Sequence, residues 1–168
     1  MPQSDFITIG NPRKIKTILT GVVDQNALNS IENEIRKNTQ QLFDLALYHY
    51  RFAGPLSSYQ WRQKVSRLYY AGYSCTKATR YYATGIYSTD GSDHKKVGDL
   101  PADFPNAATF SNKLSVLRND RNTCDYDHMS RASDLVISTP EAAQIIRDLL
   151  KETKAYFAAQ GFSLRGKV

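Results

Sequence analysis

The sequence has few cysteines, no long apolar run and no low-complexity segment, and each absence excludes a class of protein. Cys75 and Cys124 lie far apart and form no CxxC pair, so neither a disulfide framework nor a zinc site with closely spaced ligands is indicated. No stretch approaches the roughly 18 apolar residues of a membrane span. The N-terminal residues lack the basic start and apolar run of a signal peptide. We therefore expect a cytoplasmic protein that has no membrane contact.

The length and composition are those of a single soluble domain with a hydrophobic core. The chain has 168 residues, of which 41% are hydrophobic and 23% charged, which excludes a disordered or a fibrous protein. Lys and Arg (22) outnumber Asp and Glu (16), which gives a net charge of +6. This excess of positive charge is compatible with an acidic partner such as nucleic acid, or with solubility alone.

Apolar residues recur at helical spacing in four parts of the chain. The pattern predicts four long helices, over residues 24–53, 58–85, 106–128 and 139–161. Thr139 is the expected N-cap of the last helix, with Pro140 at its first helical position.

The rest of the chain is interpreted as connections and an N-terminal segment. Residues 85–105 are expected to form a loop with one short helical turn around Lys95. Residues 1–22 are interpreted as an N-terminal arm, with a short extended piece at residues 6–9, and residues 23–168 as one domain. Because no alternating pattern typical of a β-strand is found, the predicted fold is an all-α, compact bundle of about four helices.

The second predicted helix carries an unbalanced positive charge. Residues 58–84 contain five basic residues and no acidic residue: Arg62, Lys64, Arg67, Lys77 and Arg80. Such a run is either a solvated surface or the border of a groove for an acidic partner. The same helix has small residues that would let a neighbouring helix approach closely: Ala71, Gly72, Ser74 and Cys75.

The third predicted helix changes from apolar to polar along one face. At the same three- and four-residue steps, Phe110, Leu114 and Leu117 are followed by Arg121, Asp125 and His128. Arg118 falls in the same sector of roughly 80°. One interpretation is structural, with an i, i+4 ion pair of Arg121 and Asp125 and a histidine near a helix C-terminus. The other is a functional site, because unpaired charges are rarely placed on a core-facing stripe. A zinc site built on Cys124 and His128 would lack further ligands.

Two segments carry a resemblance to a known family. Residues 121–128, RNTCDYDH, resemble the signature of the HEPN superfamily, in which an Arg and a polar residue precede a His that follows after four to six intervening residues. Within this segment, residues 124–127 (CDYD) are similar to the A-D-Y-D string of many stand-alone HEPN proteins. Residues 66–73, SRLYYAGY, are similar to the S-R-x-Y-Y-A-A-F segment of the helix that packs against the catalytic one. The resemblance covers about residues 24–160.

The resemblance implies a ribonuclease that uses no metal ion or other cofactor. In such a reaction the ribose 2′-hydroxyl attacks the phosphate and leaves a 2′,3′-cyclic phosphate end. Arg121 would stabilise the negative charge on the phosphate oxygens, and His128 would move the proton. Asn122 would orient the phosphate or His128.

The resemblance also implies a homodimer in which two copies of the motif face a shared cleft for RNA. The candidate RNA-binding residues are Arg118, Asp125, Tyr126, Arg67, Tyr70 and Arg80. Arg118 alternatively pairs with Asp120 or Asp125. The expected role is that of a toxin or an antiviral defence effector, with an antitoxin or a nucleotidyltransferase as a further partner. The alternative is a catalytically inactive HEPN module that binds a nucleotide, RNA or a nucleotidyltransferase.

Overall fold

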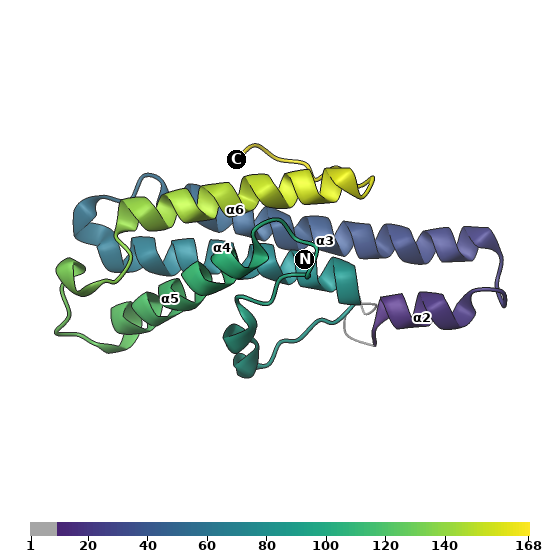
Figure 1. The fold of residues 1–168 in the computed structure, drawn as a ribbon, viewed down its shortest axis with the longest axis horizontal. Helices are drawn as coiled ribbons and strands as arrows, with labels where there is room; N and C mark the ends of the chain where they lie inside the picture. The colour runs from purple at the N-terminus through teal and green to yellow at the C-terminus, as the bar shows by residue number, and fades with distance from the viewer. Residues whose placement is uncertain (1–9) are drawn as a thin grey trace.

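The computed structural model describes residues 10–168, which form five α-helices, three short 3₁₀ helices and no strand (Figure 1). This confirms the predicted all-α class. The α-helices are α2 (Pro12–Leu19), α3 (Gln25–Ala53), α4 (Trp61–Thr84), α5 (Ala107–Tyr126) and α6 (Thr139–Ala159). The 3₁₀ helices are η1 (Ser58–Gln60), η2 (Gly91–Lys96) and η3 (Ala132–Asp134). None of these helices is both long and apolar enough to cross a membrane.

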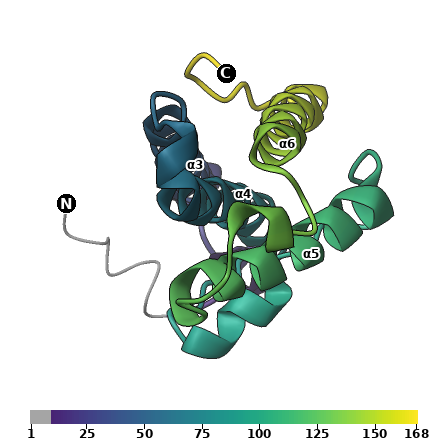
Figure 2. The same cartoon turned by 90° about the vertical axis from the view of Figure 1, so that its left-hand side faces the viewer.

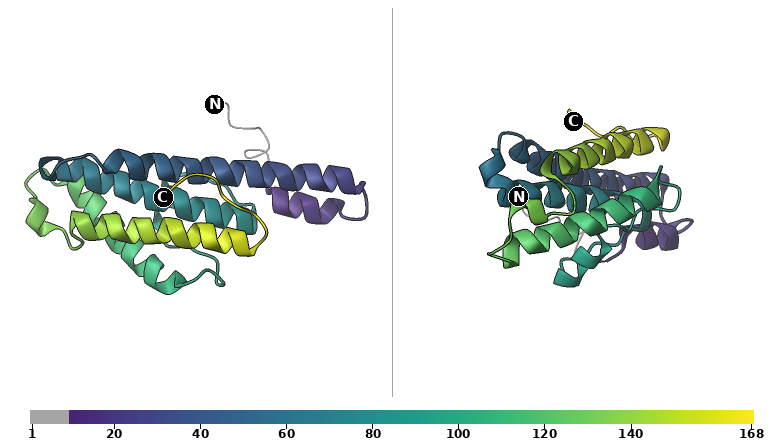
Figure 3. Two further views of the ribbon diagram at one scale, coloured as in Figure 1. Left: turned by 90° about the horizontal axis from the view of Figure 1, so that it is seen from above. Right: turned by 60° about the vertical axis from the view of Figure 1, so that its left-hand side comes forward.

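Helix α4 is the centre of the bundle, because α3, α5 and α6 all pack against it (Figure 1). Figures 2 and 3 show α3, α4 and α6 running roughly side by side, whereas α5 crosses them obliquely. The buried core joins all four helices and includes Ile35, Leu68, Leu114 and Ile146. Its side chains are apolar, so their removal from water is the main force that holds the helices together.

Two helices approach α4 closely at Gly72. A Cβ atom added there would lie 2.7 Å from Cδ2 of Leu114 and 2.9 Å from Cδ1 of Ile146. The two contacts come from α5 and α6, so one glycine lets both helices rest on α4. The close approach predicted from the small residues of this helix is therefore confirmed at Gly72.

The predicted helix starts agree with the structure to within a few residues. Asp24 is the N-cap of α3, and its Oδ1 accepts a hydrogen bond from the Ala27 amide (2.8 Å). The expected N-cap at Thr139 is wrong by one residue. Ser138 has extended backbone angles and its Oγ accepts from the Glu141 amide, so Ser138 caps α6 and Thr139 is its first residue. The short helical turn expected around Lys95 is confirmed as η2.

The predicted C-terminal end of α5 is wrong, and this matters for the site. The helix ends at Tyr126 instead of His128, because Asp127 adopts extended angles (φ −100°, ψ 97°). The Oδ1 of Asp127 then accepts a hydrogen bond from the Met129 amide (3.0 Å), which stabilises a turn. His128 therefore lies in this turn, and its expected helical register with Arg121 does not apply.

Part of the segment interpreted as an arm is helix α2, which lies against one end of α3 (Figures 1 and 3). Glu32 of α3 accepts hydrogen bonds from Arg13 (2.8 Å) and Lys16 (2.7 Å). The Asn11 side-chain amide donates to the Thr84 carbonyl at the end of α4 (2.7 Å). The extended piece expected at residues 6–9 lies outside the described residues.

Candidate functional site

A surface pocket of about 530 Å³ lies between α4 and the C-terminal end of α5. Its lining residues are mostly of polar type, with two arginines and one carboxylate, and are Arg62, Gln63, Ser66, Arg67, Tyr70, Cys124, Asp125 and His128. Four residues predicted from the sequence as site residues are thus brought together: Arg67, Tyr70, Asp125 and His128. The pocket is open to solvent.

Arg121 lies directly behind two of the lining residues and is held in place by them. Its Nε is 2.8 Å from Oδ2 of Asp125, and its Nη2 donates to the Tyr70 hydroxyl (2.9 Å). The Nη1 group donates to the side-chain oxygen of Asn122 (3.2 Å). Ser66 of α4 donates to the other carboxylate oxygen of Asp125 (2.8 Å). The i, i+4 ion pair of Arg121 and Asp125 is therefore present, and it is fixed to α4 from two directions.

Three tyrosine rings surround the guanidinium of Arg121. Its central carbon lies 5.8 Å from the ring centre of Tyr69, 5.5 Å from that of Tyr70 and 5.7 Å from that of Tyr126. Such contacts stabilise a cation by about 0.5–2 kcal/mol. Tyr69 is buried, whereas Tyr126 is 73% exposed and presents its ring to solvent. Of the three rings, Tyr126 therefore leaves the largest surface for an unpaired base.

His128 lies on the exposed side of the pocket, in a turn that Arg62 ties to α4. The Arg62 guanidinium donates to the carbonyl groups of Cys124 (2.7 Å), Asp127 (2.8 Å) and Ser130 (2.8 Å). It also lies 3.1 Å from the Ser130 hydroxyl. Arg62 was expected only as one charge of a basic helix face, and the structure shows that it determines where α5 ends.

Arg67 lines the pocket and packs against α3. Its Nη1 is 3.3 Å from Nδ1 of His49, and its guanidinium lies 4.6 Å from the ring centre of Phe52. Burial and the charge of Arg67 lower the pKa of His49, so this histidine is neutral at pH 7. One hydrogen-bonding face of Arg67 is therefore already used inside the protein.

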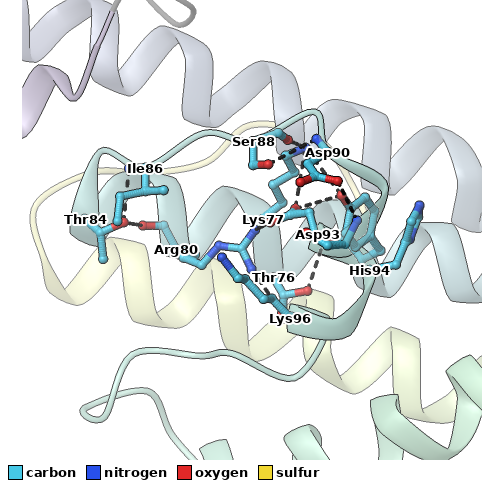
Figure 4. Close-up of polar contacts among 12 residues, drawn as sticks. Thr76, Lys77, Arg80, Thr84, Ile86, Ser88, Asp90, Asp93, His94 and Lys96 are labelled. Carbon is cyan, nitrogen blue, oxygen red and sulfur yellow. Dashed lines mark hydrogen bonds and ion pairs between the residues drawn. The ribbon is translucent and has the colours of Figure 1, made fainter.

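Arg80 is not among the residues that line the pocket, because it forms a separate buried cluster with Asp93 of η2 (Figure 4). Both Oδ atoms of Asp93 accept from Arg80 Nη2 (2.7 Å each), and Oδ2 also accepts from the Tyr73 hydroxyl (2.8 Å). Lys77 lies 3.8 Å from the same carboxylate and donates to the Ser88 carbonyl. The positive charges of Arg80 and Lys77 on α4 are balanced by the carboxylate of Asp93 in η2. A count of the charges on α4 alone does not include this carboxylate.

The side chain of Arg118 makes no hydrogen bond or ion pair with any residue between 10 and 168. The pairing with Asp120 does not form, because the buried Asp120 carboxylate accepts from the backbone amides of Val136 (3.0 Å) and Ile137 (2.9 Å). The pairing with Asp125 does not form either, since Asp125 binds Arg121. Arg118 thus keeps its donors for a ligand.

His94 is a residue of this region that the sequence reasoning missed. Its Nδ1 lies 2.8 Å from the Tyr69 hydroxyl, and its ring stacks on Tyr73 with centres 4.5 Å apart. Burial and the charge of Arg121 lower the pKa of His94. The three histidines of the sequence, His49, His94 and His128, therefore all lie around Tyr70 and Arg121. No spacing pattern reveals this, because each histidine belongs to a different element.

Comparisons of the chain with protein-family models, with curated proteins and with solved structures found no match. Within residues 10–168, no group of three or more His, Cys, Asp or Glu side chains is arranged to hold a metal ion. Burial raises the pKa of the Cys124 thiol to about 11, so this lining residue is a neutral thiol at pH 7.

Proposed function

We propose that the protein is a metal-independent endoribonuclease of the HEPN type. The observation that carries this proposal is that His128 lines a pocket together with Tyr70 and Asp125, the two residues that orient Arg121. Asp125 links the two parts, because it lines the pocket and pairs with Arg121. This is the combination of a proton-transfer group and a fixed cation that cleavage of RNA by its own 2′-hydroxyl requires.

Arg121 is the group that stabilises the negative charge of the transition state. Its Nη1 and Nη2 groups each carry a second hydrogen beyond those bonded to Asn122 and Tyr70. A guanidinium with N–H groups of this kind can donate to the oxygens of a phosphate. Because the guanidinium is already fixed by Tyr70 and Asp125, little reorganisation is needed when a phosphate arrives.

The RNA backbone is bound by the cations at the rim of the pocket, and unpaired bases stack on exposed rings. Arg67 lines the pocket, and Arg118 of α5 is a further cation, whose charge acts on Tyr69 and His94. Tyr126 supplies an exposed ring beside Arg121. Stacking on such a ring is sequence-tolerant, so we expect a single-stranded substrate. The role that follows is that of a toxin or an antiviral defence effector.

A second copy of the chain completes the site. One chain offers one Arg121 and one His128, and the pocket is open to solvent. Next to its wall, Tyr48 and Phe52 of α3 are 58% and 42% exposed, and Phe52 packs against Arg67. Exposed aromatic side chains beside a polar site are typical of an interface. The homodimer would therefore be formed across this face.

A catalytically inactive HEPN module that binds a nucleotide, RNA or a nucleotidyltransferase is the second candidate. The observation in its favour is the ion pair itself, because the charge of Arg121 is already balanced by Asp125 at 2.8 Å. An arginine held in this way can serve to stabilise the folded structure as well as to take part in catalysis. The two candidates differ in whether bonds in RNA are broken.

The deciding experiment is cleavage of total cellular RNA by the purified protein in EDTA. If the protein is the proposed enzyme, it cleaves RNA and leaves 2′,3′-cyclic phosphate ends. Arg121→Ala and His128→Ala should then each lose this activity, while light scattering still finds the dimer. Arg147→Ala is the matched control, because Arg147 is an arginine of α6 that bonds only Tyr50 at the surface. Binding of RNA without cleavage would support the inactive module. Full cleavage by both variants would rule out this site.

A further inference from the structure

His94 and Arg121 face the same two aromatic rings from different elements. The His94 ring centre lies 5.8 Å from that of Tyr69 and 6.0 Å from that of Tyr70. The Arg121 guanidinium lies 5.8 Å and 5.5 Å from the same two ring centres. Tyr70 also lines the pocket that His128 lines. The ring of Tyr70 is therefore a common neighbour of His94, Arg121 and the pocket with His128.

The position of His94 is fixed by its neighbour in the chain. The Asp93 side chain is buried and accepts hydrogen bonds from Arg80 and Tyr73, which anchors η2 on α4 (Figure 4). Figure 4 shows His94 directed away from Arg80. His94 itself is only partly buried and stacks on Tyr73. A histidine that is fixed in place yet accessible is suited to proton transfer.

We infer that His94 and His128 divide the proton transfers of the reaction, with His94 as the general base and His128 as the general acid. This inference rests on the proposed ribonuclease function and adds to it a second catalytic residue. In this arrangement Arg121 holds the phosphate, and the two histidines act on opposite sides of it. A base and an acid on opposite sides of a phosphate are what an in-line displacement requires, because the attacking and the leaving oxygen lie on opposite sides of phosphorus.

The proposed step is balanced in atoms and charge. Nε2 of His94 takes the proton from the ribose 2′-hydroxyl, and the 2′-oxygen forms a bond to phosphorus. The bond from phosphorus to the 5′-oxygen breaks, and that oxygen takes a proton from His128. The products are a 2′,3′-cyclic phosphate and a 5′-hydroxyl, and exchange of protons with water restores both histidines.

The surroundings of His94 favour the tautomer that this role needs. Burial raises the pKa of Tyr69 to about 12, so its oxygen is a neutral hydroxyl that can accept a hydrogen bond. With a proton on Nδ1 donated to Tyr69, the Nε2 lone pair of His94 is free to accept a proton. Burial and the charge of Arg121 lower the pKa of His94, which keeps it neutral at pH 7. The titratable and charged groups that face His94 are Tyr69, Tyr70, Tyr73 and Lys77 of α4, Asp93 of η2, and Arg118 and Arg121 of α5.

The experiment compares two RNA substrates, one normal and one with sulfur in place of the bridging 5′-oxygen at the cleaved linkage. A thiolate leaves without a proton, so this substrate needs the base but not the acid. We expect His128→Ala to lose at least about 100-fold in rate on normal RNA and to recover most of it on the sulfur substrate. We expect His94→Gln to lose a similar factor on both substrates. Recovery of His94→Gln on the sulfur substrate would overturn the assignment of its role.

The pH dependence and a control variant complete the test. For the wild type, kcat/KM should rise with pH as His94 loses its proton, with a midpoint below 6.5, and His94→Gln should lack this rise. Binding of an RNA with a 2′-deoxyribose at the cleaved position should change less than about twofold, which separates catalysis from folding. Arg147→Ala, the surface control, should keep the pH profile. If Arg121→Ala abolishes cleavage but His94→Gln leaves rate and profile unchanged, this inference falls and the proposed function stands. If the wild type cleaves no RNA, both fall.

Discussion

Arg62 of α4 donates hydrogen bonds to the carbonyl groups of Ser130 (2.8 Å), Asp127 and Cys124, and so joins the central helix to the turn that carries His128. The guanidinium thus binds one carbonyl of the last turn of α5, that of Cys124, and two carbonyls of the segment that follows the helix. This relationship makes Arg62 a positioning residue for His128, although the pocket it lines would suggest direct contact with a ligand.

Replacing Arg62 with alanine should release the turn and impair catalysis through His128. Loss of the hydrogen bonds leaves several carbonyl groups without their partner, and we expect a decrease of about 1–3 kcal/mol in the free energy of unfolding, measured with urea. The rate should fall by up to about 100-fold in kcat with less change in KM.

Two further variants separate this role of Arg62 from its charge. Arg62→Lys keeps the charge but cannot reach three carbonyl groups, so it should behave like Arg62→Ala. Lys64→Ala removes the same charge from α4 but breaks only the bond to the Leu56 carbonyl, so catalysis should be retained. Full activity of Arg62→Lys would show that only the charge matters.

Replacing Asp125 with asparagine should strengthen the binding of RNA. The Asp125 carboxylate competes with a phosphate for the Arg121 guanidinium, since it lies 2.8 Å from Nε. Without this carboxylate, an uncleavable RNA should bind more tightly. In a plot of the logarithm of the binding constant against the logarithm of the salt concentration, the slope should become more negative by about one. Ser66→Ala, which removes only the hydrogen bond to Asp125, is the control and should leave the slope unchanged. Weaker binding by Asp125→Asn would mean that the carboxylate contacts the base or the ribose.

Reversing the charge of Arg67 should weaken RNA binding without unfolding the protein. Arg67 lines the pocket and packs on exposed Phe52, so Arg67→Glu removes a cation from the rim. We expect a lower salt slope in the same binding assay. Arg80→Gln is the matched variant. Because Arg80 binds buried Asp93, this change should lower thermal stability and leave the salt slope unaltered. Equal effects of both changes on the slope would place Arg80 in contact with RNA.

The Asp93 cluster should make stability depend on pH in the acid range. Burial alone would raise the pKa of Asp93, but the hydrogen bond from Tyr73 and the charges of Arg80 and Lys77 lower it below its ordinary value of 3.8. Since the folded state holds this proton more weakly than the unfolded state, the stabilisation is complete above pH 3.8 and is lost as the pH falls below it.

Asp93→Asn is the variant that measures this contribution. At pH 7 it leaves Arg80 and Lys77 without their carboxylate, and we expect a loss of about 3–5 kcal/mol in the free energy of unfolding. The difference from the wild type should shrink as the pH falls below 3.8, in urea unfolding monitored by circular dichroism. A difference that stays constant down to pH 2 would mean that Asp93 is not the group that titrates.

The four long helices are predictable from the sequence because each has an apolar face of helical period, and α3 and α6 also begin at a residue whose side chain caps the helix. The Gly72 contact follows from residue size, since a Cβ atom at this position would force the Leu114 or Ile146 side chain to shift. The end of α5 is not predictable in this way, because it depends on hydrogen bonds from Arg62, which is far away in the sequence. Such a contact cannot be predicted from the spacing of the apolar residues.

The candidate site was predicted only in part, for the same reason. The Arg121 and Asp125 pair is local, since one helical turn separates the two residues, and it could be read from their spacing. His94 and Asp93 reach the site from η2, and their partners are tyrosines and cations of α4. Side chains that meet only through folding of distant segments leave no periodic signal, so a count of charges on one helix made α4 look unbalanced.

The contacts that attach α2 to the rest of the protein should be weakened by salt, whereas the packing of the core around α4 should not. Pro12 is the only buried residue of α2, and the helix is held by polar contacts, chiefly those of Arg13 and Lys16 with Glu32. Contacts of this kind are screened by ions, whereas the apolar core around α4 is not. Amide hydrogens of α2 should therefore exchange faster as the salt concentration rises, while those of α4 keep their protection. The N-terminal helix can thus come free from the bundle while the pocket between α4 and α5 stays intact.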